Sequence, residues 1–220
     1  MIKIGCFIPI KSNSERIPGK NFKVLNNKKL YEHIIEHAME AECFDDIYVD
    51  TNSEEITKYA EVHNLKIIKR LEKLAGNTAN GNDLLVYHNS IYPDYDFYFQ
   101  LFATAPFLQA ETIKNCVNKL TDGEEYDSCF TAIKHNGFFW INKHPVNYLP
   151  NILPRSQDLE PVLEETTGLY GITKESLEKY QCRIGRRPYV YFIDKFEAID
   201  INNETDFKIA EIIGKDYWGK

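Results

Sequence analysis

The sequence predicts an α/β fold in which a largely parallel sheet is covered by helices on both faces. Short apolar runs with strand character alternate along the chain with segments whose apolar residues recur at helical spacing. A hydrophobic content of 43% in 220 residues is enough for one substantial core. Because parallel strands need a crossover between them, this alternation favours a sheet that is buried on both sides.

The elements can be assigned in order from the start of the chain. Residues 3–10 are predicted to form a buried first strand, and residues 30–42 a helix whose apolar side chains share one face. Residues 46–50 form the second predicted strand, and the polar run at 51–53 followed by two acids is typical of a capped helix start. The next predicted elements are a strand at 65–69, a helix at 82–91, a strand at 96–102, a helix at 110–120 and a strand at 127–134.

The alternation stops between residues 135 and 161, where aromatic residues and prolines are mixed with polar ones. A segment this long usually has a role, so we expect a lid or a dimer arm, with a long surface loop as the alternative. We therefore predict a single domain over residues 1–220 with an excursion at 135–161. Beyond the excursion, the predicted elements are a strand at 168–172, a helix from Lys174, a strand at 189–193 and a helix at 204–213.

Charge and cysteine content exclude several classes of function. The formal net charge is −7, the pI is near 5.4 and the cations are scattered, which argues against a nucleic-acid partner. The five cysteines are odd in number and include no Cys-x-x-Cys pair, as expected of reduced thiols. No long apolar segment and no cleavable signal pattern is present. We expect a soluble, cytoplasmic protein without a membrane partner.

The first strand leads into the most informative segment, residues 7–21, which read FIPIKSNSERIPGKN. Lys11, Arg16 and Lys20 lie there close to a Pro18-Gly19 turn. Backbone N–H groups in a sharp turn form an anion-binding concavity, and three cations add the charge that triphosphate oxygens need. The segment matches neither the Walker A pattern nor the dinucleotide fingerprint. It predicts a polyanion site, with an ordinary solvated loop as the alternative.

The end of this segment, residues 17–21, resembles the signature loop of the cytidylyltransferases that activate acidic sugars, above all the acylneuraminate (CMP-sialic acid) synthetases. Lys20 falls on the family's lysine, and Lys11 falls on its leading arginine. Lys11 keeps the charge but not the bidentate fork of a guanidinium, which Arg16 could restore. The nucleotide contacts that the resemblance implies in this loop are Lys11, Ser12, Asn13, Lys20 and Asn21.

Two segments after the second strand extend the resemblance. Residues 50–56 are similar to a family segment that follows the same strand. Residues 69–79 are similar to a family loop that borders the nucleotide, with Arg70 on the family's arginine and Asn77 on its aspartate. The resemblance therefore implies that Arg70 and Asn77 contact CTP, although Asn77 brings no charge.

Two later segments point to the acceptor. Residues 102–108 resemble the family's Gln-Pro-Thr-Ser-Pro-Leu-Arg at the end of the fourth strand, where ligands of open α/β sheets bind. Phe102 replaces the family's glutamine and Leu108 its last arginine, while Gln100 lies on the same side of the strand as Phe102 and could substitute. Residues 154–170 match a family segment whose arginine reaches an acidic sugar across the dimer. The implied acceptor contacts are Gln100, Phe102, Thr104, Arg155 and Tyr170.

The last matching segment, residues 198–207, bears on a metal. In the family two aspartates spaced i and i+2 hold Mg²⁺ near the phosphates; Asp200 matches the first and Asn202 replaces the second. An amide oxygen is acceptable to a hard cation but reduces the charge that holds it. The resemblance implies Mg²⁺ or another divalent cation at Asp200 and Asn202, and it implies the catalytic set Lys11, Arg16, Lys20 and Asp200.

Taken together, the resemblance implies a three-layer α/β/α Rossmann-like nucleotidyltransferase fold with a mostly parallel mixed sheet. It implies a homodimer formed through residues 135–161. The implied reaction joins CTP to an acidic sugar of the nonulosonic, sialic-like class and gives a CMP-sugar and pyrophosphate.

Other interpretations remain open. Phe102 and Leu108 favour a different acid acceptor, such as a deoxyoctulosonic or non-sugar acid, and Asn202 also permits a non-catalytic nucleotide-binding protein on the same fold. His33 and His37 have the i, i+4 spacing of a metal pair but lack an evident third ligand. The remaining candidates for substrate contact are His135 and His144.

Overall fold

The computed structural model describes residues 1–14, 17–76, 78–123 and 125–218, and a seven-stranded sheet forms its centre. The strand order is β11-β7-β10-β6-β1-β4-β5. In this sheet β10 is antiparallel to both of its neighbours, whereas the other pairings are parallel, so the sheet is mixed but mostly parallel, as predicted. The strands are β1 (Ile4–Ile10), β4 (Asp46–Thr51), β5 (Lys66–Lys69), β6 (Phe97–Leu101), β7 (Ser128–His135), β10 (Val162–Thr173) and β11 (Pro188–Phe192).

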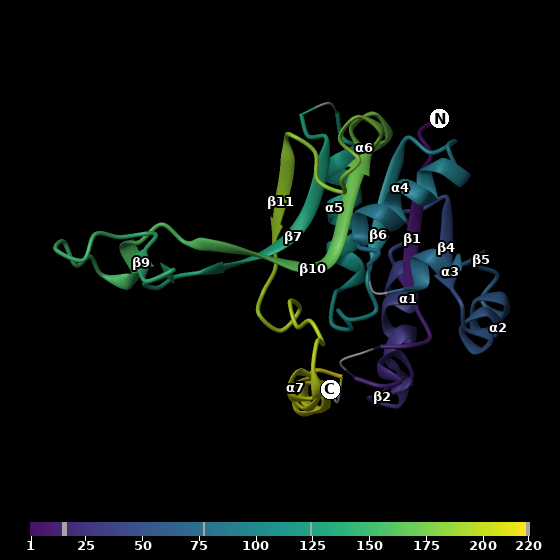
Figure 1. The fold of residues 1–220 in the computed structure, drawn as a ribbon, viewed down its shortest axis with the longest axis horizontal. Coiled ribbons are helices and arrows are strands. Elements are labelled where there is room, and N and C mark those ends of the chain that lie inside the picture. The colour runs from purple at the N-terminus through teal and green to yellow at the C-terminus, as the bar shows by residue number, and fades with distance from the viewer. Residues whose placement is uncertain (15–16, 77, 124, 219–220) are drawn as a thin grey trace.

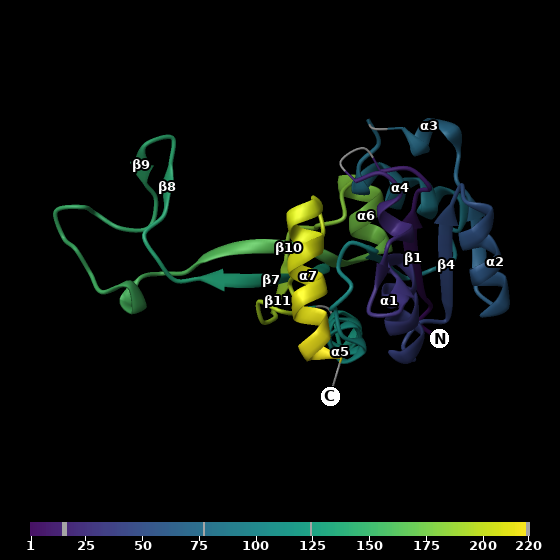
Figure 2. The ribbon, with the colours of Figure 1, turned by 90° about the horizontal axis from the view of Figure 1, so that it is seen from below.

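Helices cover both faces of this sheet (Figures 1 and 2). Cys6 and Ile8 of β1 join a core with α1 and α5, while Phe7 points to the opposite face and packs in a core with α4 and α6. Because side chains alternate between the faces of a strand, this two-sided burial explains the continuous apolar run in β1. The helices are α1 (Leu30–Glu40), α2 (Glu54–Val62), α3 (Glu72–Ala75), α4 (Gly81–Ile91), α5 (Ala110–Thr121), α6 (Lys174–Tyr180) and α7 (Glu204–Tyr217).

The predicted strands and helices are confirmed, with two notable differences. Strand β10 begins at Val162, well before the predicted start at residue 168, because it pairs with the far end of β7. A register shift follows Glu165, and Thr167 has a φ of 53° there. A small hairpin of β2 (Val24–Leu25) and β3 (Lys28–Lys29) was not predicted, although the two asparagines of its turn adopt the positive φ typical of a tight hairpin.

Residues 136–161 form an arm that projects from the ends of β7 and β10, far from the rest of the chain (Figures 1 and 2). A short hairpin, β8 (Trp140–Ile141) with β9 (His144–Pro145), and a 3-10 turn, η2 (Ser156–Asp158), lie within it. This arm corresponds to the predicted excursion at 135–161. Its role in dimer formation stays a prediction.

A buried charge cluster ties β4 to the segment after β5 and to α4. The Arg70 guanidinium donates to the Asp50 carboxylate through Nε and Nη2, each at 3.0 Å, and His88 Nε2 lies 2.9 Å from the same carboxylate. The Arg70 and Asp50 side chains are 4% and 1% exposed. Burial acts to raise the pKa of Asp50, but the hydrogen bonds from His88 and Arg70 outweigh it and leave the pKa below its usual value. The Asp50 carboxylate is therefore ionised, and its buried charge is stabilised by Arg70 and His88.

Two simpler expectations can be checked against the fold. The five cysteines are free thiols, and three of them, Cys6, Cys116 and Cys129, are buried. In the part of the chain that the structure describes, no helix combines the length and the apolar character needed to cross a bilayer.

Replacing Arg70 with alanine should lower the free energy of unfolding by about 3 kcal/mol or more at neutral pH, because the substitution leaves the buried Asp50 charge without its main partner. Urea denaturation followed by circular dichroism measures this. The loss should shrink as the pH falls, since protonation of Asp50 removes the stranded charge. The exposed Arg187→Ala is the matched control and should change stability by about 0.5 kcal/mol or less. Equal effects of the two substitutions would contradict this account of the charge cluster.

Candidate functional site

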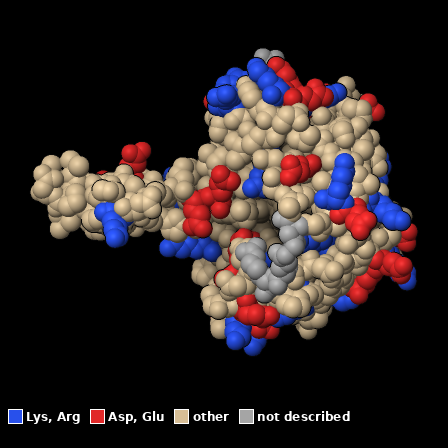
Figure 3. Space-filling model, viewed as in Figure 1, with Lys and Arg blue, Asp and Glu red and all other residues tan. Residues whose placement is uncertain are grey.

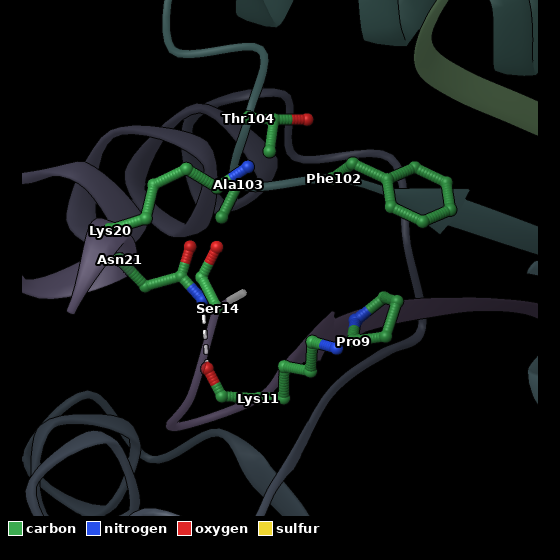
Figure 4. Close-up of a pocket in the computed structure, with 8 residues that line it drawn as sticks. All are labelled: Pro9, Lys11, Ser14, Lys20, Asn21, Phe102, Ala103 and Thr104. Carbon is green, nitrogen blue, oxygen red and sulfur yellow. Dashed lines mark hydrogen bonds between the residues drawn. The ribbon is translucent and has the colours of Figure 1, made fainter. Parts of the chain in front are cut away.

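The candidate site lies where two neighbouring parallel strands end at the same edge of the sheet. Strands β1 and β6 are paired, and the segments that follow them line one pocket. Ligands of open α/β sheets bind beyond the carboxyl ends of such strands. The space-filling view shows a hollow near the middle of this face, with basic and acidic side chains on its rim (Figure 3). The lining residues are Pro9, Lys11, Ser14, Lys20, Asn21, Phe102, Ala103 and Thr104 (Figure 4).

Gly19 sets the direction of the loop after β1. Its φ of 65° is left-handed, a conformation that glycine adopts without steric cost, and it starts the 3-10 turn η1 (Lys20–Phe22). The turn brings Lys20 to the pocket, where the residue is only 7% exposed. Its Nζ donates a hydrogen bond of 2.8 Å to the backbone carbonyl of Ile201. A lysine charge is therefore held at the pocket in largely desolvated surroundings.

Side-chain amides hold the same loop in place. The Asn21 Nδ2 donates to the Lys11 carbonyl at 2.8 Å, and its Oδ1 is directed toward the pocket (Figure 4). The Ser12 backbone N–H donates to Asn52 Oδ1 at 2.8 Å, which joins the loop to the end of β4. Asn13 is exposed. The loop is thus fixed at several points around the predicted anion site.

Residues 200–202 come to this place from the far end of the chain. The Ile201 N–H donates to the Thr104 carbonyl at 2.8 Å, and the Ile201 carbonyl accepts from Lys20. Asn202 donates through Nδ2 to Asp200 Oδ2, while Asp200 Oδ1 is buried without a hydrogen-bond partner. The predicted phosphate residue Lys20, the predicted acceptor residue Thr104 and the predicted metal residues are therefore brought together.

A buried carboxylate oxygen without a partner is what a bound cation would satisfy. Asp200 Oδ1 has this character, and oxygen donors suit hard divalent cations. Among the described residues, no three histidine, cysteine, aspartate or glutamate side chains cluster as a ready metal site. A cation at Asp200 would accordingly need ligands from outside the protein.

The other end of the pocket is aromatic. The Phe102 ring packs edge-on against the Tyr170 ring, with 6.3 Å between their centroids. Tyr170 is fully buried, its hydroxyl donates to Glu165 at 2.7 Å, and burial raises its pKa well above the usual value. Gln100, also fully buried, donates through Nε2 to the Gly81 carbonyl at 3.0 Å.

Arg183 lies against these rings, and sequence reasoning missed it. Its guanidinium carbon is 3.6 Å from the centroid of the Tyr170 ring and 5.6 Å from that of Phe102. It belongs to a segment with two further arginines, Arg186 and Arg187, and nothing in the sequence distinguishes it from them.

Some predicted site residues lie elsewhere or have other partners. The Arg70 guanidinium is held by Asp50, so its predicted contact with a nucleotide stays a prediction without support from its position. Arg155 lies on the arm, its side chain is 73% exposed, and it pairs with Asp158 at 2.7 Å. Arg16 and Asn77 lie outside the described residues.

The histidine alternatives gain no support. His33 Nε2 lies 2.9 Å from the Leu25 carbonyl, and burial lowers the pKa values of both His33 and His37. His135 is at the base of the arm, 2.6 Å from a Glu164 carboxylate oxygen, and His144 is in the arm hairpin.

The known proteins that this chain resembles in sequence are cytidylyltransferases. A family model described as cytidylyltransferase matches residues 6–182. The chain is 27% identical to N-acylneuraminate cytidylyltransferase A of Danio rerio, over 99% of this chain and 52% of that protein. It is 26% identical to N-acylneuraminate cytidylyltransferase of Escherichia coli, over 94% of this chain and 51% of that protein. The chain thus spans about half the length of these relatives.

A shorter relative and the solved structures agree with this. Pseudaminic acid cytidylyltransferase of Campylobacter jejuni is 26% identical, over 96% of this chain and 95% of that protein. A structure of CMP:2-keto-3-deoxy-manno-octonic acid synthetase complexed with CTP superposes with a TM-score of 0.73 at 15% identity, covering 97% of this chain and 99% of that chain. A 4-diphosphocytidyl-2C-methyl-D-erythritol synthase of Anaerococcus prevotii has a TM-score of 0.71 at 13% identity, covering 100% and 99%. At these identities the structures confirm the predicted fold.

Gly19→Ala should lower the free energy of unfolding by about 1 kcal/mol, because alanine at a left-handed φ is strained even though open space surrounds the position. Gly76→Ala is the matched control, since that glycine has a φ of −68° and also has room for a methyl group. It should leave stability unchanged or slightly raised. Thermal and urea unfolding of both variants measure the difference, and an equal response would show that the turn does not depend on this φ.

Proposed function

The chain belongs to the cytidylyltransferase family, and we propose that it transfers the cytidylyl group of CTP to an acidic sugar of the nonulosonic class, releasing pyrophosphate. Two named groups of relatives, the N-acylneuraminate and pseudaminic acid cytidylyltransferases, support this class of acceptor. The observation that carries the proposal is the meeting of Lys20, Thr104 and residues 200–202 at the carboxyl ends of β1 and β6.

In this reaction an acceptor hydroxyl oxygen forms a bond to the α-phosphorus, and the bond from that phosphorus to the oxygen bridging to the β-phosphate breaks. Pyrophosphate leaves with the electron pair, and the hydroxyl proton is released to solvent. Negative charge builds on the phosphoryl oxygens and the leaving group. Lys20 and Lys11 at the pocket would stabilise that charge, most strongly at the buried Lys20, where little water screens it.

Positioning supplies the rest of the catalysis. Asn21 fixes the Lys11 backbone, and the Ile201 carbonyl fixes the Lys20 amino group, so the Lys20 cation is held in place before substrate binds. Fixed charges need no reorganisation when the transition state forms. We propose that the loop residues Lys11, Ser12, Asn13, Lys20 and Asn21 hold the nucleotide, with Arg16 assisting.

A divalent cation such as Mg²⁺ fits Asp200, whose Oδ1 is buried without a partner, and Asn202 could contribute its amide oxygen after rotation of the side chain. When bound, such a cation would neutralise charge on the phosphate oxygens. Asn202 adds no charge of its own. The phosphates and water would therefore supply more of the ligands that hold the cation than they would in a site with a second aspartate.

The acceptor end favours a specificity different from that of the sialic acid enzymes. Phe102 presents an aromatic ring at the pocket where the family pattern has a glutamine. Gln100, two residues earlier, is buried and retains an unpartnered Oε1. We therefore regard a different acid, such as a deoxyoctulosonic or a non-sugar acid, as the leading alternative acceptor. A non-catalytic nucleotide-binding protein on this fold is the second alternative.

We also propose that the arm forms a homodimer contact. Its exposed apolar side chains are what a partner subunit would cover, and Arg155 among them could then reach the partner's site rather than its own. These apolar side chains are 42% to 75% exposed: Phe138, Trp140, Ile141, Val146, Leu149, Ile152 and Leu153.

With CTP and Mg²⁺, the chain should release pyrophosphate in the presence of at least one acid from a panel of N-acetylneuraminic, pseudaminic and 2-keto-3-deoxy-manno-octonic acids. Lys20→Ala should lower kcat by about 100-fold or more, because it removes a fixed charge at the phosphates. Lys23→Ala removes a nearby, partly exposed lysine, paired with Glu204, and should leave the rate within about twofold. CTP binding without turnover of any acid would favour the non-catalytic alternative, and no binding of CTP would contradict the proposal.

The double substitution Leu149→Glu and Ile152→Glu should convert a dimer into a monomer in sedimentation velocity, because it places two charges on the apolar surface of the arm. Val62→Glu is the control, since Val62 is 79% exposed on α2, away from the arm. A wild-type chain that sediments as a monomer at micromolar concentration would count against the arm as a dimer contact.

A further inference from the structure

We propose that Arg183 binds the carboxylate of the acidic acceptor, with the Tyr170 ring as its support. This inference rests on the proposed function and names a residue that the family resemblance does not supply. It assigns the aromatic end of the pocket to the acceptor and its cationic loop to the nucleotide.

The partners of Arg183 are the first reason. Among the described residues, arginine ion pairs join Arg70 to Asp50 and Arg155 to Asp158, and none of them involves Arg183. Its guanidinium instead lies 3.6 Å above the Tyr170 ring. A guanidinium over an aromatic face is held in position by cation–π attraction and keeps its N–H groups available at its edges.

The backbone of Arg183 is fixed as well. Its N–H donates to Asn82 Oδ1 at 3.0 Å, which attaches the residue to the start of α4. The position is half-buried, whereas the neighbouring Arg186 and Arg187 are exposed. A guanidinium held through both its ring contact and its backbone is well placed to bind a ligand of opposite charge.

The absence of a side chain at Gly81 makes room for the guanidinium itself and brings it close to Gln100. A Cβ added at Gly81 would come within 2.5 Å of Arg183 Nη1 and 3.1 Å of Gln100 Oε1. These two polar atoms therefore lie against the same glycine. Gln100 is 0% exposed, and its Oε1 has no hydrogen-bond partner. A buried acceptor oxygen is normally satisfied by a hydrogen-bond donor, and a hydroxyl group of the ligand could be that donor.

Phe102 connects this place to the nucleotide pocket. It lines the pocket with Lys11, Lys20 and Thr104, and its ring centroid is 5.6 Å from the Arg183 guanidinium. A molecule that occupies both places would present a nucleophile near the phosphates and an anion to Arg183. A polyhydroxylated acid has this combination of groups, because its carboxylate suits the guanidinium fork and a hydroxyl suits Gln100.

The test is a kinetic cycle between protein and substrate. The acid that wild-type chain turns over is compared with its methyl ester, which removes the charge and keeps the hydroxyl groups. For the wild-type chain, kcat/KM for the ester should be about 100-fold below that for the acid, since a charge-assisted pair is lost. Arg183→Leu should lower kcat/KM for the acid by a similar factor, leave the KM for CTP unchanged and abolish the difference between acid and ester. Arg183→Lys should be intermediate.

Three further variants test the assignment of Arg183 in the same acid and ester assay. Gly81→Ala keeps the arginine but places a methyl group against its Nη1, so it should raise the KM for the acid and not that for CTP. Arg186→Leu is the matched control and should behave as wild type. Arg155→Leu should retain the preference for acid over ester. Direct CTP binding to each variant verifies that it is folded.

The possible results distinguish a failure of the Arg183 assignment from a failure of the proposed function. An Arg183→Leu variant that still prefers acid over ester, or that loses CTP affinity instead, would overturn the inference while the proposed function stands. Loss of the preference in Arg155→Leu alone would move the carboxylate contact to the arm. A wild-type chain that turns over none of the acids would remove the proposed function, and the inference with it.

Discussion

The site depends on one buried amino group. Lys20 is 7% exposed, and its Nζ donates to the Ile201 carbonyl at 2.8 Å. A desolvated ammonium is costly unless it is hydrogen-bonded, so this contact draws residues 200–202 to the loop after β1. The Ile201 N–H in turn donates to the Thr104 carbonyl. Three segments that are far apart in the sequence therefore meet around a single charge, and Asp200 is brought there with them.

Much of this arrangement could be predicted because its causes are local. Two-sided burial makes β1 apolar along its length, and the Pro18-Gly19 turn fixes the direction in which Lys20 points. The start of β10 could not be predicted in the same way. Leu163, Glu164 and Glu165 are exposed there, so no alternation of apolar and polar residues indicates a strand, and only pairing with β7 reveals one.

Long-range partners account for the other differences. Arg70 has the sequence context of a nucleotide contact, yet its guanidinium is bound by the buried Asp50 on the neighbouring strand. For Arg183, by contrast, the sequence context indicates no contact with a ligand, whereas the structure places its side chain against the aromatic rings of the site. Its segment has three arginines that look alike in the sequence, and packing against Tyr170 alone distinguishes the one that faces the site. Sequence supplies the residue types, whereas the topology decides which charges are neutralised inside the protein and which remain for ligands.

A crystal structure of the chain with CTP would show whether the Lys20 pocket holds the triphosphate. We expect phosphate oxygens within about 3.2 Å of Lys20 Nζ and of backbone N–H groups in the loop after β1. We also expect the Phe102 and Arg183 end to remain open for the acceptor. A nucleotide bound elsewhere, with Lys20 in contact with the Ile201 carbonyl and no phosphate, would contradict these expectations.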